Sequence, residues 1–427
     1  MFKELHPNIR IRIYTSFLSR VIGSMIFPFM AIYFTKELNA SWAGILLMIQ
    51  TVVQFIASLY GGHLADTLGR KRMMVAGEWM KVIAFLGMLL ANSPWFTSAW
   101  MTFFMLLAIS ISSGIVNPAA EAMLIDVSTK ETRAFMYSIN YWAVNLSIML
   151  GLIVGGWLYN SHFFELIVAL FVMSLITLWM TATLIIETYQ MKPSQRSTSS
   201  YGLKPLIQSY QSVMKDWPFL LFTLGGIAVL SIEFQRNNFI AVRLEKEIIP
   251  QTFSLIGMGH LIVDGVKLLS LLTVVNTVII VLFTAFVSKW IRHKPDKPIM
   301  YTGFLLFGFG YSFLAFSNNV LLLFMAVIVL SIGELLYVPT RQSLLADIVD
   351  DSRRGAYMAF NGFVFQIGKM VGALGIIAGQ AIGGIGMGML YILLGVLGIV
   401  FCSLGIRMRT TKEQPNPSHL ATKKVPS

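Results

Sequence analysis

Residues 118–140, PAAEAMLIDVSTKETRAFMYSIN, and residues 339–361, PTRQSLLADIVDDSRRGAYMAFN, carry the same four residues at the same spacing. In each stretch a proline, an aspartate, an arginine and an asparagine are separated by seven, six and six residues. This agreement indicates that the chain contains two copies of one unit. Each copy lies between the fourth and fifth apolar stretch of its half, which is where duplication of a six-helix unit would place it.

The apolar stretches around these repeats are long enough to cross a membrane. Hydrophobic residues make up 56% of the 427 residues and charged residues only 12%, and the mean hydropathy is +0.72. A helix of about 20 apolar residues crosses the hydrocarbon core of a bilayer. The sequence therefore predicts an all-α integral membrane protein of about twelve transmembrane helices, the first of them retained rather than cleaved as a signal peptide. We expect these helices at 11–35, 42–65, 73–93, 98–121, 136–158, 163–186, 217–240, 267–290, 298–317, 320–343, 357–380 and 385–406.

A polar segment rich in serine separates the sixth apolar stretch from the seventh, and this marks a domain boundary. We expect an N-terminal six-helix bundle at 1–186, a cytoplasmic linker at 187–216, a C-terminal six-helix bundle at 217–406 and a cytoplasmic tail at 407–427.

The formal charge of +12 is distributed along the chain in a way that indicates membrane topology rather than nucleic-acid binding. Alternate connections carry the cations, and the positive-inside rule then places both termini in the cytoplasm. Lys36 and the 243–267 connection are exceptions. The basic connections hold Arg70, Lys71 and Arg72; Lys130 and Arg133; Lys192, Arg196 and Lys204; Lys289, Arg292 and Lys294; and Arg353 and Arg354.

The connection between the second and third predicted helices, GHLADTLGRKR at 62–72, resembles the motif found at this place in the major facilitator superfamily. The resemblance implies the major facilitator fold, in which two six-helix bundles surround a central site and take turns in opening it to either side of the membrane. The corresponding turn of the second half, around 288–294, keeps only the basic character.

Four residues at this connection, together with Arg133 of the first repeated stretch, are candidates for a conformational switch. We expect Gly62 and Gly69 to allow close approach and a sharp turn, and Asp66 to accept hydrogen bonds from Arg133 or from a helix N-terminus. Arg70, directly after Gly69, is the remaining candidate residue of this switch. An alternative remains for the aspartate and the arginine of the repeated pattern, and Arg133 is this arginine in the first copy. In that alternative these residues only fix loop geometry at the membrane surface.

Within the superfamily, the whole chain resembles drug:proton antiporters, and most closely the LmrP-type multidrug exporters. The resemblance implies that Glu334 is a membrane-embedded carboxylate involved in drug binding and protonation. The chain departs from that group where Asn140 replaces an aspartate, and where Asn237 replaces an acidic residue with Glu233 one turn earlier. In the fifth predicted helix, Leu152 also stands where that group usually has a proline. The stretches that carry the resemblance are AMLID at 122–126, YWAVNLS at 141–147 and GELLYVP at 333–339.

Ionisable residues inside apolar stretches are costly, so each is a candidate for function. Glu334, near the middle of its helix, is the strongest candidate for proton exchange. Lys369 could instead be its permanent counter-ion. Arg20 lies in the first helix, where it binds an anionic group or pairs with a carboxylate such as Glu121; both alternatives stay open.

Two further pairs of opposite charge are spaced three residues apart. Glu78 and Lys81 are expected to satisfy one another on the third helix. Glu233 and Arg236 on the seventh helix lie where the fold implies a cavity, so a structural and a functional role are equally open.

The sequence predicts a transporter rather than an enzyme, because it has neither a phosphate-binding G-x-x-x-x-G-K motif nor a histidine cluster for a metal. We expect no cofactor and no metal, and a monomer in the cytoplasmic membrane that binds a small-molecule substrate and protons. The first hypothesis is proton-coupled export of drugs or amphiphilic compounds. The alternatives are proton-coupled transport of an anionic metabolite, peptide or lipid, and a non-transporting receptor on the same scaffold.

Overall fold

The computed structural model describes residues 5–128, 130–188, 213–255, 259–291, 294–349 and 354–413; within these ranges some side chains, among them those of Asp66 and Arg133, lie outside the description. The N-terminal half contains α1 (Pro7–Ile26), the short 3₁₀ helix η2 (Phe27–Phe29), α2 (Met30–Glu37), α3 (Ala40–Leu68), α4 (Arg70–Leu90), α5 (Ala99–Asp126), α6 (Lys130–Leu158) and α7 (Phe163–Leu184). The C-terminal half contains α9 (Trp217–Glu233), the π-helical turn η4 (Arg236–Ile240), α10 (Ala241–Glu247), α11 (Gly265–Ile291), α12 (Asp296–Phe316), α13 (Val320–Ile348) and α14 (Arg354–Glu413).

The described helices account for the twelve predicted spans. Ten helical runs are long and apolar enough to cross a membrane, and Trp142–Leu158, the apolar part of α6, is a shorter one. One of the ten, Phe360–Thr410, contains two spans, because α14 is broken at Gly383. Gly383 has φ +67° and ψ −179°, a conformation that is essentially restricted to glycine.

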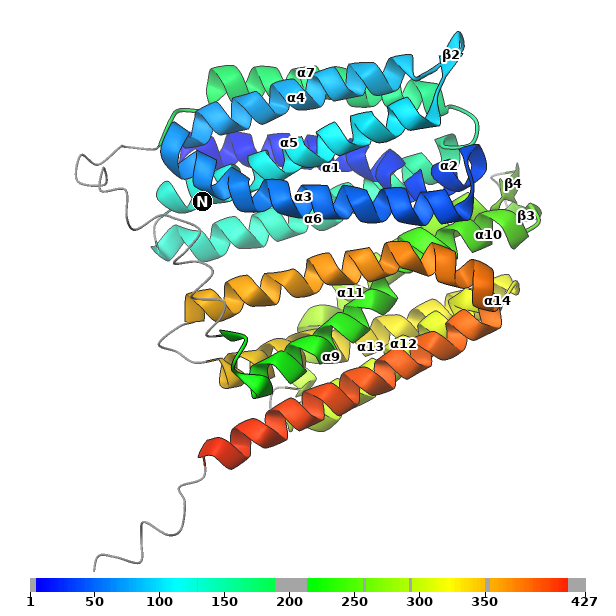
Figure 1. The fold of residues 1–427 in the computed structure, drawn as a ribbon. Helices are drawn as coiled ribbons and strands as arrows, with labels where there is room; N and C mark the ends of the chain where they lie inside the picture. The colour runs from blue at the N-terminus through cyan, green and yellow to red at the C-terminus, as the bar shows by residue number, and fades with distance from the viewer. Residues whose placement is uncertain are drawn as a thin grey trace, which may run out of the picture.

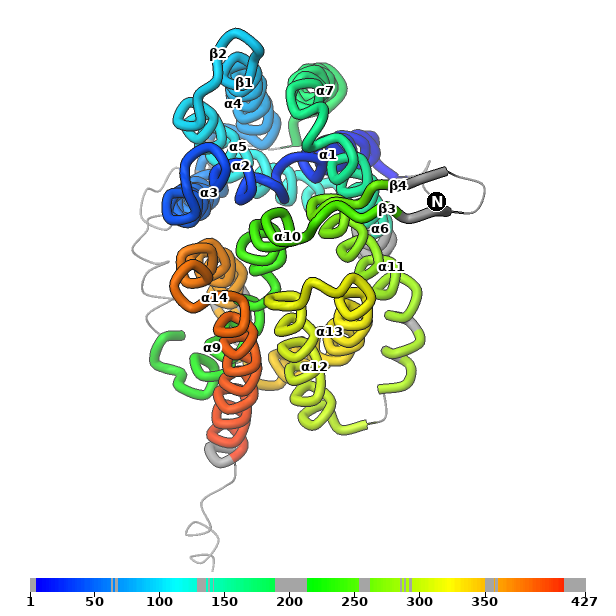
Figure 2. Tube along the Cα trace, turned by 90° about the vertical axis from the view of Figure 1, so that its right-hand side faces the viewer, coloured from blue at the N-terminus to red at the C-terminus, as the bar shows by residue number. Residues whose placement is uncertain are grey.

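The two halves form two groups of helices that lie side by side (Figures 1 and 2). In the N-terminal half α5 packs against α3 and α4, and α1 packs against α6; in the C-terminal half α9 packs on α14 and α12 on α13. Contacts between α3 and α14 and between α6 and α11 join the halves. Both copies of the repeated pattern run from the end of one helix into the next, from α5 into α6 and from α13 into α14, as predicted.

Two short antiparallel hairpins, which the sequence did not predict, lie at one end of the molecule. They are β1 (Asn92–Ser93) with β2 (Phe96–Thr97), and β3 (Gln251–Leu255) with β4 (Gly259–Val263). Figure 1 shows them at the opposite end from the start of α1 and the end of α14. We call the two ends the hairpin end and the termini end.

The cations that break the predicted charge alternation have partners at the hairpin end. The Lys36 ammonium lies 2.6 Å from the Glu245 carboxylate. Arg243, only 3% exposed, donates hydrogen bonds to the carbonyls of Leu314 (2.9 Å) and Ser317 (2.7 Å) at the C-terminus of α12. These carbonyls have no partner within their own helix, so a buried guanidinium stabilises that helix end.

Candidate functional site

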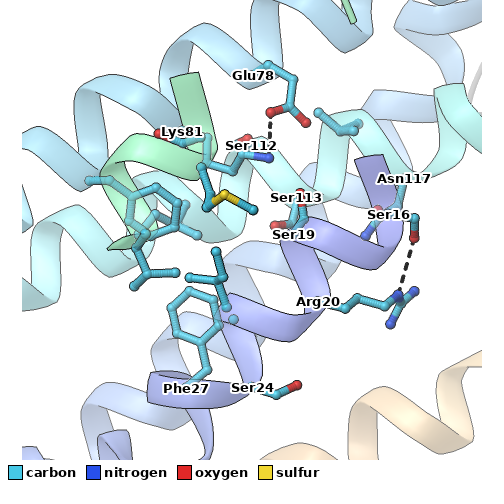
Figure 3. A pocket seen from close by; sticks show the side chains of 18 of the residues that line it. Ser16, Ser19, Arg20, Ser24, Phe27, Glu78, Lys81, Ser112, Ser113 and Asn117 are labelled. Atoms are coloured by element: carbon cyan, nitrogen blue, oxygen red, sulfur yellow. Dashed lines mark hydrogen bonds and ion pairs between the residues drawn. The ribbon is translucent and has the colours of Figure 1, made fainter. Parts of the chain in front are cut away.

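A cavity of about 430 Å³ lies within the N-terminal half, among α1, α4, α5 and α7 (Figure 3). One face of α1 forms a wall, because Arg12, Ser16, Ser19, Arg20 and Gly23 recur every three to four residues along that helix. The same walls carry apolar side chains, and one residue comes from the other half. The apolar side chains include Phe27, Phe85, Ile109, Leu170 and Met173, and the residue from the C-terminal half is Asn237 on η4.

Arg20 and Arg12 bring two positive charges to this cavity. The Arg20 Nε donates a hydrogen bond to Ser16 Oγ at 3.4 Å. Among the side chains that the structure describes, neither arginine forms an ion pair with a carboxylate, and Glu121 is exposed on α5 without a contact to Arg20. Arg20 therefore has no ion-pair partner among the described carboxylates, and Glu121 acts on it only from a distance.

Glu78 and Lys81 form the predicted ion pair in the cavity wall. The Lys81 ammonium lies 2.5 Å from Glu78 Oε2, which also accepts a hydrogen bond from Thr177 Oγ1 of α7 at 2.9 Å. Glu78 is 2% exposed. Because the two charges cancel and both are held by neighbours, this pair ties α4 to α7 and leaves Arg12 and Arg20 as the net charge of the cavity.

A second group of polar side chains lies inside the C-terminal half, and it includes the partly buried Glu334. Asn276 of α11 lies at its centre and is 5% exposed. The Asn276 Nδ2 donates to Glu334 Oε2 at 3.1 Å and to Ser331 Oγ at 2.9 Å, while its Oδ1 accepts a hydrogen bond from Arg236 Nη1 at 2.8 Å. A void of about 10 Å³ beside Arg236 and Asn276 is close to the size that holds one water molecule. We call Arg236, Asn276, Ser331 and Glu334 the Asn276 network.

Two pairings that the sequence left open in this half are not formed by the described side chains. Lys369 is not the counter-ion of Glu334, since no ion pair joins these two described side chains and the Lys369 ammonium lies 5.0 Å from the centre of the Phe365 ring. Glu233 and Arg236 do not form an ion pair either. The α-helix ends at Glu233 and the wider η4 begins at Arg236, so the two side chains lack the three-residue geometry of a regular helix.

The switch motif has different partners from those expected. Gly69 has φ +104° and makes the predicted sharp turn between α3 and α4. The prediction of close approach at Gly62 is wrong, because among the described atoms a Cβ there would meet only Pro118, at 3.9 Å. The tight contact with Gly114 of α5 is made by Gly61. The interactions expected for Asp66 and Arg133 lie outside the described side chains.

Glu187, which follows α7, caps the N-terminus of α4. Its two carboxylate oxygens accept hydrogen bonds from the backbone N–H groups of Arg70 (3.0 Å) and Lys71 (3.1 Å). The Arg70 Nε lies 3.3 Å from Asp126 Oδ2 at the end of α5, and Thr188 Oγ1 donates to the same oxygen at 3.2 Å. A carboxylate at a helix N-terminus is stabilised by the free N–H groups there. These contacts join the α3–α4 turn to the ends of α5 and α7.

Asn140, on α6, is partly buried and does not line the 430 Å³ cavity. Sequence reasoning missed Asn276, Glu187 and Arg341. The amide of Asn276 could have been found as a polar residue in the middle of the eighth apolar stretch. Arg341 near the end of α13, whose guanidinium lies 5.5 Å from the Phe222 ring centre and whose Nη2 donates to Asn361 Oδ1 at 3.5 Å, could have been found as a charge inside the tenth.

Comparison of the chain with known proteins identifies its family. The chain is 29% identical over 404 residues to a "Na(+), Li(+), K(+)/H(+) antiporter" of Planococcus maritimus, covering 93% of this chain and 95% of that protein. It is 24% identical over 362 residues to the multidrug resistance protein MdtH of Baumannia cicadellinicola, covering 82% of this chain and 79% of that one. A solved POT family transporter in complex with 5-aminolevulinic acid shares the fold, with a TM-score of 0.72 at 14% identity over 95% of this chain and 96% of that chain. The sequence model of the Major Facilitator Superfamily matches residues 13–242 and 252–427, so the chain belongs to this superfamily and is a secondary transporter rather than an enzyme.

Proposed function

We propose that the protein exports drugs or amphiphilic compounds in exchange for protons, acting as a monomer by alternating access. The observation that carries the proposal is the coexistence of two separate features in one transporter fold. One is a drug-sized cavity of about 430 Å³ with apolar walls and polar groups, and the other is a partly buried carboxylate, Glu334, in the Asn276 network. The names of the antiporter and multidrug relatives support exchange of this kind.

Glu334 is the proposed proton-exchange site, with Arg236 as the neighbouring cation. The amide of Asn276 is oriented by Arg236 on its oxygen and by Ser331 on its nitrogen, so it presents an N–H to Glu334. That bond is charge-assisted when Glu334 is ionised and weaker when Glu334 is protonated. Proton uptake therefore loosens the tie between α11 and α13, which is how binding of a proton can bias the arrangement of helices.

Three polar contacts at the hairpin end support a conformation that is closed there. Besides the Lys36–Glu245 ion pair, Ser41 Oγ donates to Gln380 Oε1 at 2.9 Å. Asn160 Nδ2 donates to Asp264 Oδ2 at 3.2 Å, again from one half to the other. Together with the predicted charge alternation, this leads us to propose that the hairpin end faces the outside and that both termini are cytoplasmic.

The access switch is proposed at the termini end, within the N-terminal half. Glu187 and Asp126 hold Arg70 and the start of α4, and Glu187 is the first residue of the proposed linker between the two bundles. Movement of the bundles would pull on this segment. Asp66 and Arg133 are assigned to the same switch on the family resemblance alone, and the bundle limits proposed from the sequence, 1–186 and 217–406, fit this arrangement.

The test is transport of a cationic dye by the purified full chain in proteoliposomes. An acid interior should drive uptake of ethidium through inverted molecules, and Glu334→Gln should abolish the dependence on the pH gradient. Glu165→Gln, an exposed acid at the start of α7, is the matched control and should behave as the native chain does. Gradient-driven uptake by Glu334→Gln would exclude Glu334 as the coupling carboxylate. If imposed Na⁺ or K⁺ gradients alone moved protons, the activity named for the Planococcus relative would replace drug export.

A further inference from the structure

The charges around the 430 Å³ cavity suit an anionic substrate better than a cationic one. Of the described residues that line it, only Glu78 is acidic, and its charge is used by Lys81 and Thr177. Arg12 and Arg20 are left, both on the same face of α1. Neither forms an ion pair with a described carboxylate, although Glu121 of α5 acts on both guanidinium groups from a distance and Glu78 acts on Arg12. A cationic ligand would meet two like charges here.

Arg20 has the donors to hold an oxyanion. A guanidinium carries five N–H groups in a planar fork, and the one described hydrogen bond of Arg20, to Ser16 at 3.4 Å, uses a single N–H. The arginine side chain is exposed and projects from α1 in Figure 3. The remaining N–H groups suit a carboxylate or sulfonate, which arginine binds through two parallel hydrogen bonds. Hydroxyl groups of Ser16, Ser19 and Ser113 line the same cavity and add donors.

The apolar part of the wall lies apart from this charge. The rings of Phe27 and Phe85 stack at a centroid distance of 6.4 Å, and Met173 and Leu170 of α7 line the cavity with them. In Figure 3 Arg20 and Ser16 lie on one side of α1, away from Phe27. A site with cationic donors on one side and aromatic and thioether surface on the other matches a molecule with one acidic group and an apolar body.

We propose that this cavity binds amphiphilic organic anions, with the acidic group held by Arg20 and Arg12 and the apolar body packed against Phe27, Phe85 and Met173. The inference rests on the proposed proton-driven export and names the class of substrate that is exported. A small inorganic anion would leave the apolar walls and most of the volume unused.

The experiment compares two aromatic probes of opposite charge in the same proteoliposomes. Anilinonaphthalene sulfonate carries a fixed negative charge and ethidium a fixed positive one. With an acid interior, the native chain is expected to take up the anion in preference to the cation. Arg20→Gln and Arg12→Gln should each raise the half-saturating concentration of the anion by about tenfold or more, the loss expected for a charge-assisted hydrogen bond.

Two further variants separate charge recognition from damage to the fold. Lys297→Gln removes an equal charge from the exposed first turn of α12, outside the cavity, and should leave anion uptake as in the native chain. Arg20→Lys keeps the charge but loses the planar fork, so it should restore part of the affinity. All variants are first compared by size-exclusion profile and thermal unfolding, and only folded proteins are assayed for uptake.

The outcomes separate this inference from the function on which it rests. Gradient-driven uptake of ethidium without uptake of the sulfonate overturns the anion site and leaves proton-coupled export in place. Equal loss of both probes in Arg20→Gln also overturns it, because the arginine would then act through structure and not through charge. Failure of the native chain to move either probe overturns both proposals.

Discussion

The Asn276 side chain joins Arg236 to Glu334 through a single buried amide. Asn276→Leu keeps nearly the same shape but removes all three hydrogen bonds of the amide. Leaving buried polar partners unsatisfied costs about 1–3 kcal/mol, so the variant should unfold at a lower temperature in detergent than the native chain. Thr277→Val is the control, because the Thr277 hydroxyl donates only to the Thr273 carbonyl of its own helix. If both variants unfolded at the same temperature, the Asn276 network would not stabilise the bundle.

At the residue scale, the sequence identifies single charged groups better than their partners. Glu334 stood out because a carboxylate inside an apolar stretch is costly wherever it lies. Its partner Asn276 lies 58 residues away and on another helix, and no periodicity connects the two. Glu187 was missed for the same reason, being 117 residues from the backbone N–H that it caps. Glu233 and Arg236 had the spacing of an ion pair, and a local π-helical turn removed the geometry.

At the scale of elements, the turn between α3 and α4 depends on Gly69 both for its conformation and for its cap. Gly69→Ala would strain the backbone at φ +104° and place a Cβ 2.7 Å from Glu187 Oε2, displacing the carboxylate from the start of α4. The strain alone costs about 1–3 kcal/mol, and the lost cap adds about 0.5–2 kcal/mol.

Gly383→Ala is the matched control, because Gly383 has a similar glycine-only conformation and an added Cβ would have no atom within 4 Å. Thermal unfolding should therefore show a larger loss for Gly69→Ala than for Gly383→Ala. Equal losses would mean that only backbone strain matters and that the Glu187 cap contributes nothing. The glycine at 69 was predictable from the motif, whereas the cap was not.

At the scale of the whole molecule, composition predicted the twelve spans, because the apolar solvent around each segment sets its length and hydrophobicity. The spacing shared by residues 118–140 and 339–361 predicted the repeat. The hairpins and the closed hairpin end could not be predicted, because they depend on how the two halves pack. The Lys36–Glu245 pair illustrates this: Lys36 counted as an exception to the charge rule until its partner on α10 was seen.

The sign of the substrate charge also determines how the whole transporter responds to membrane potential. Exchange of one outgoing cation for one incoming proton moves no net charge, whereas exchange of one outgoing anion for one proton moves two. Since one charge crossing about 100 mV is worth about 2.3 kcal/mol, a potential of that size would drive anion export by roughly 4.6 kcal/mol. With the pH fixed, a K⁺ diffusion potential set by valinomycin should therefore change the rate of sulfonate transport and leave ethidium transport unaltered. Sulfonate transport that did not respond to the potential would contradict exchange of an organic anion for a proton and would require the anion and the proton to move in the same direction.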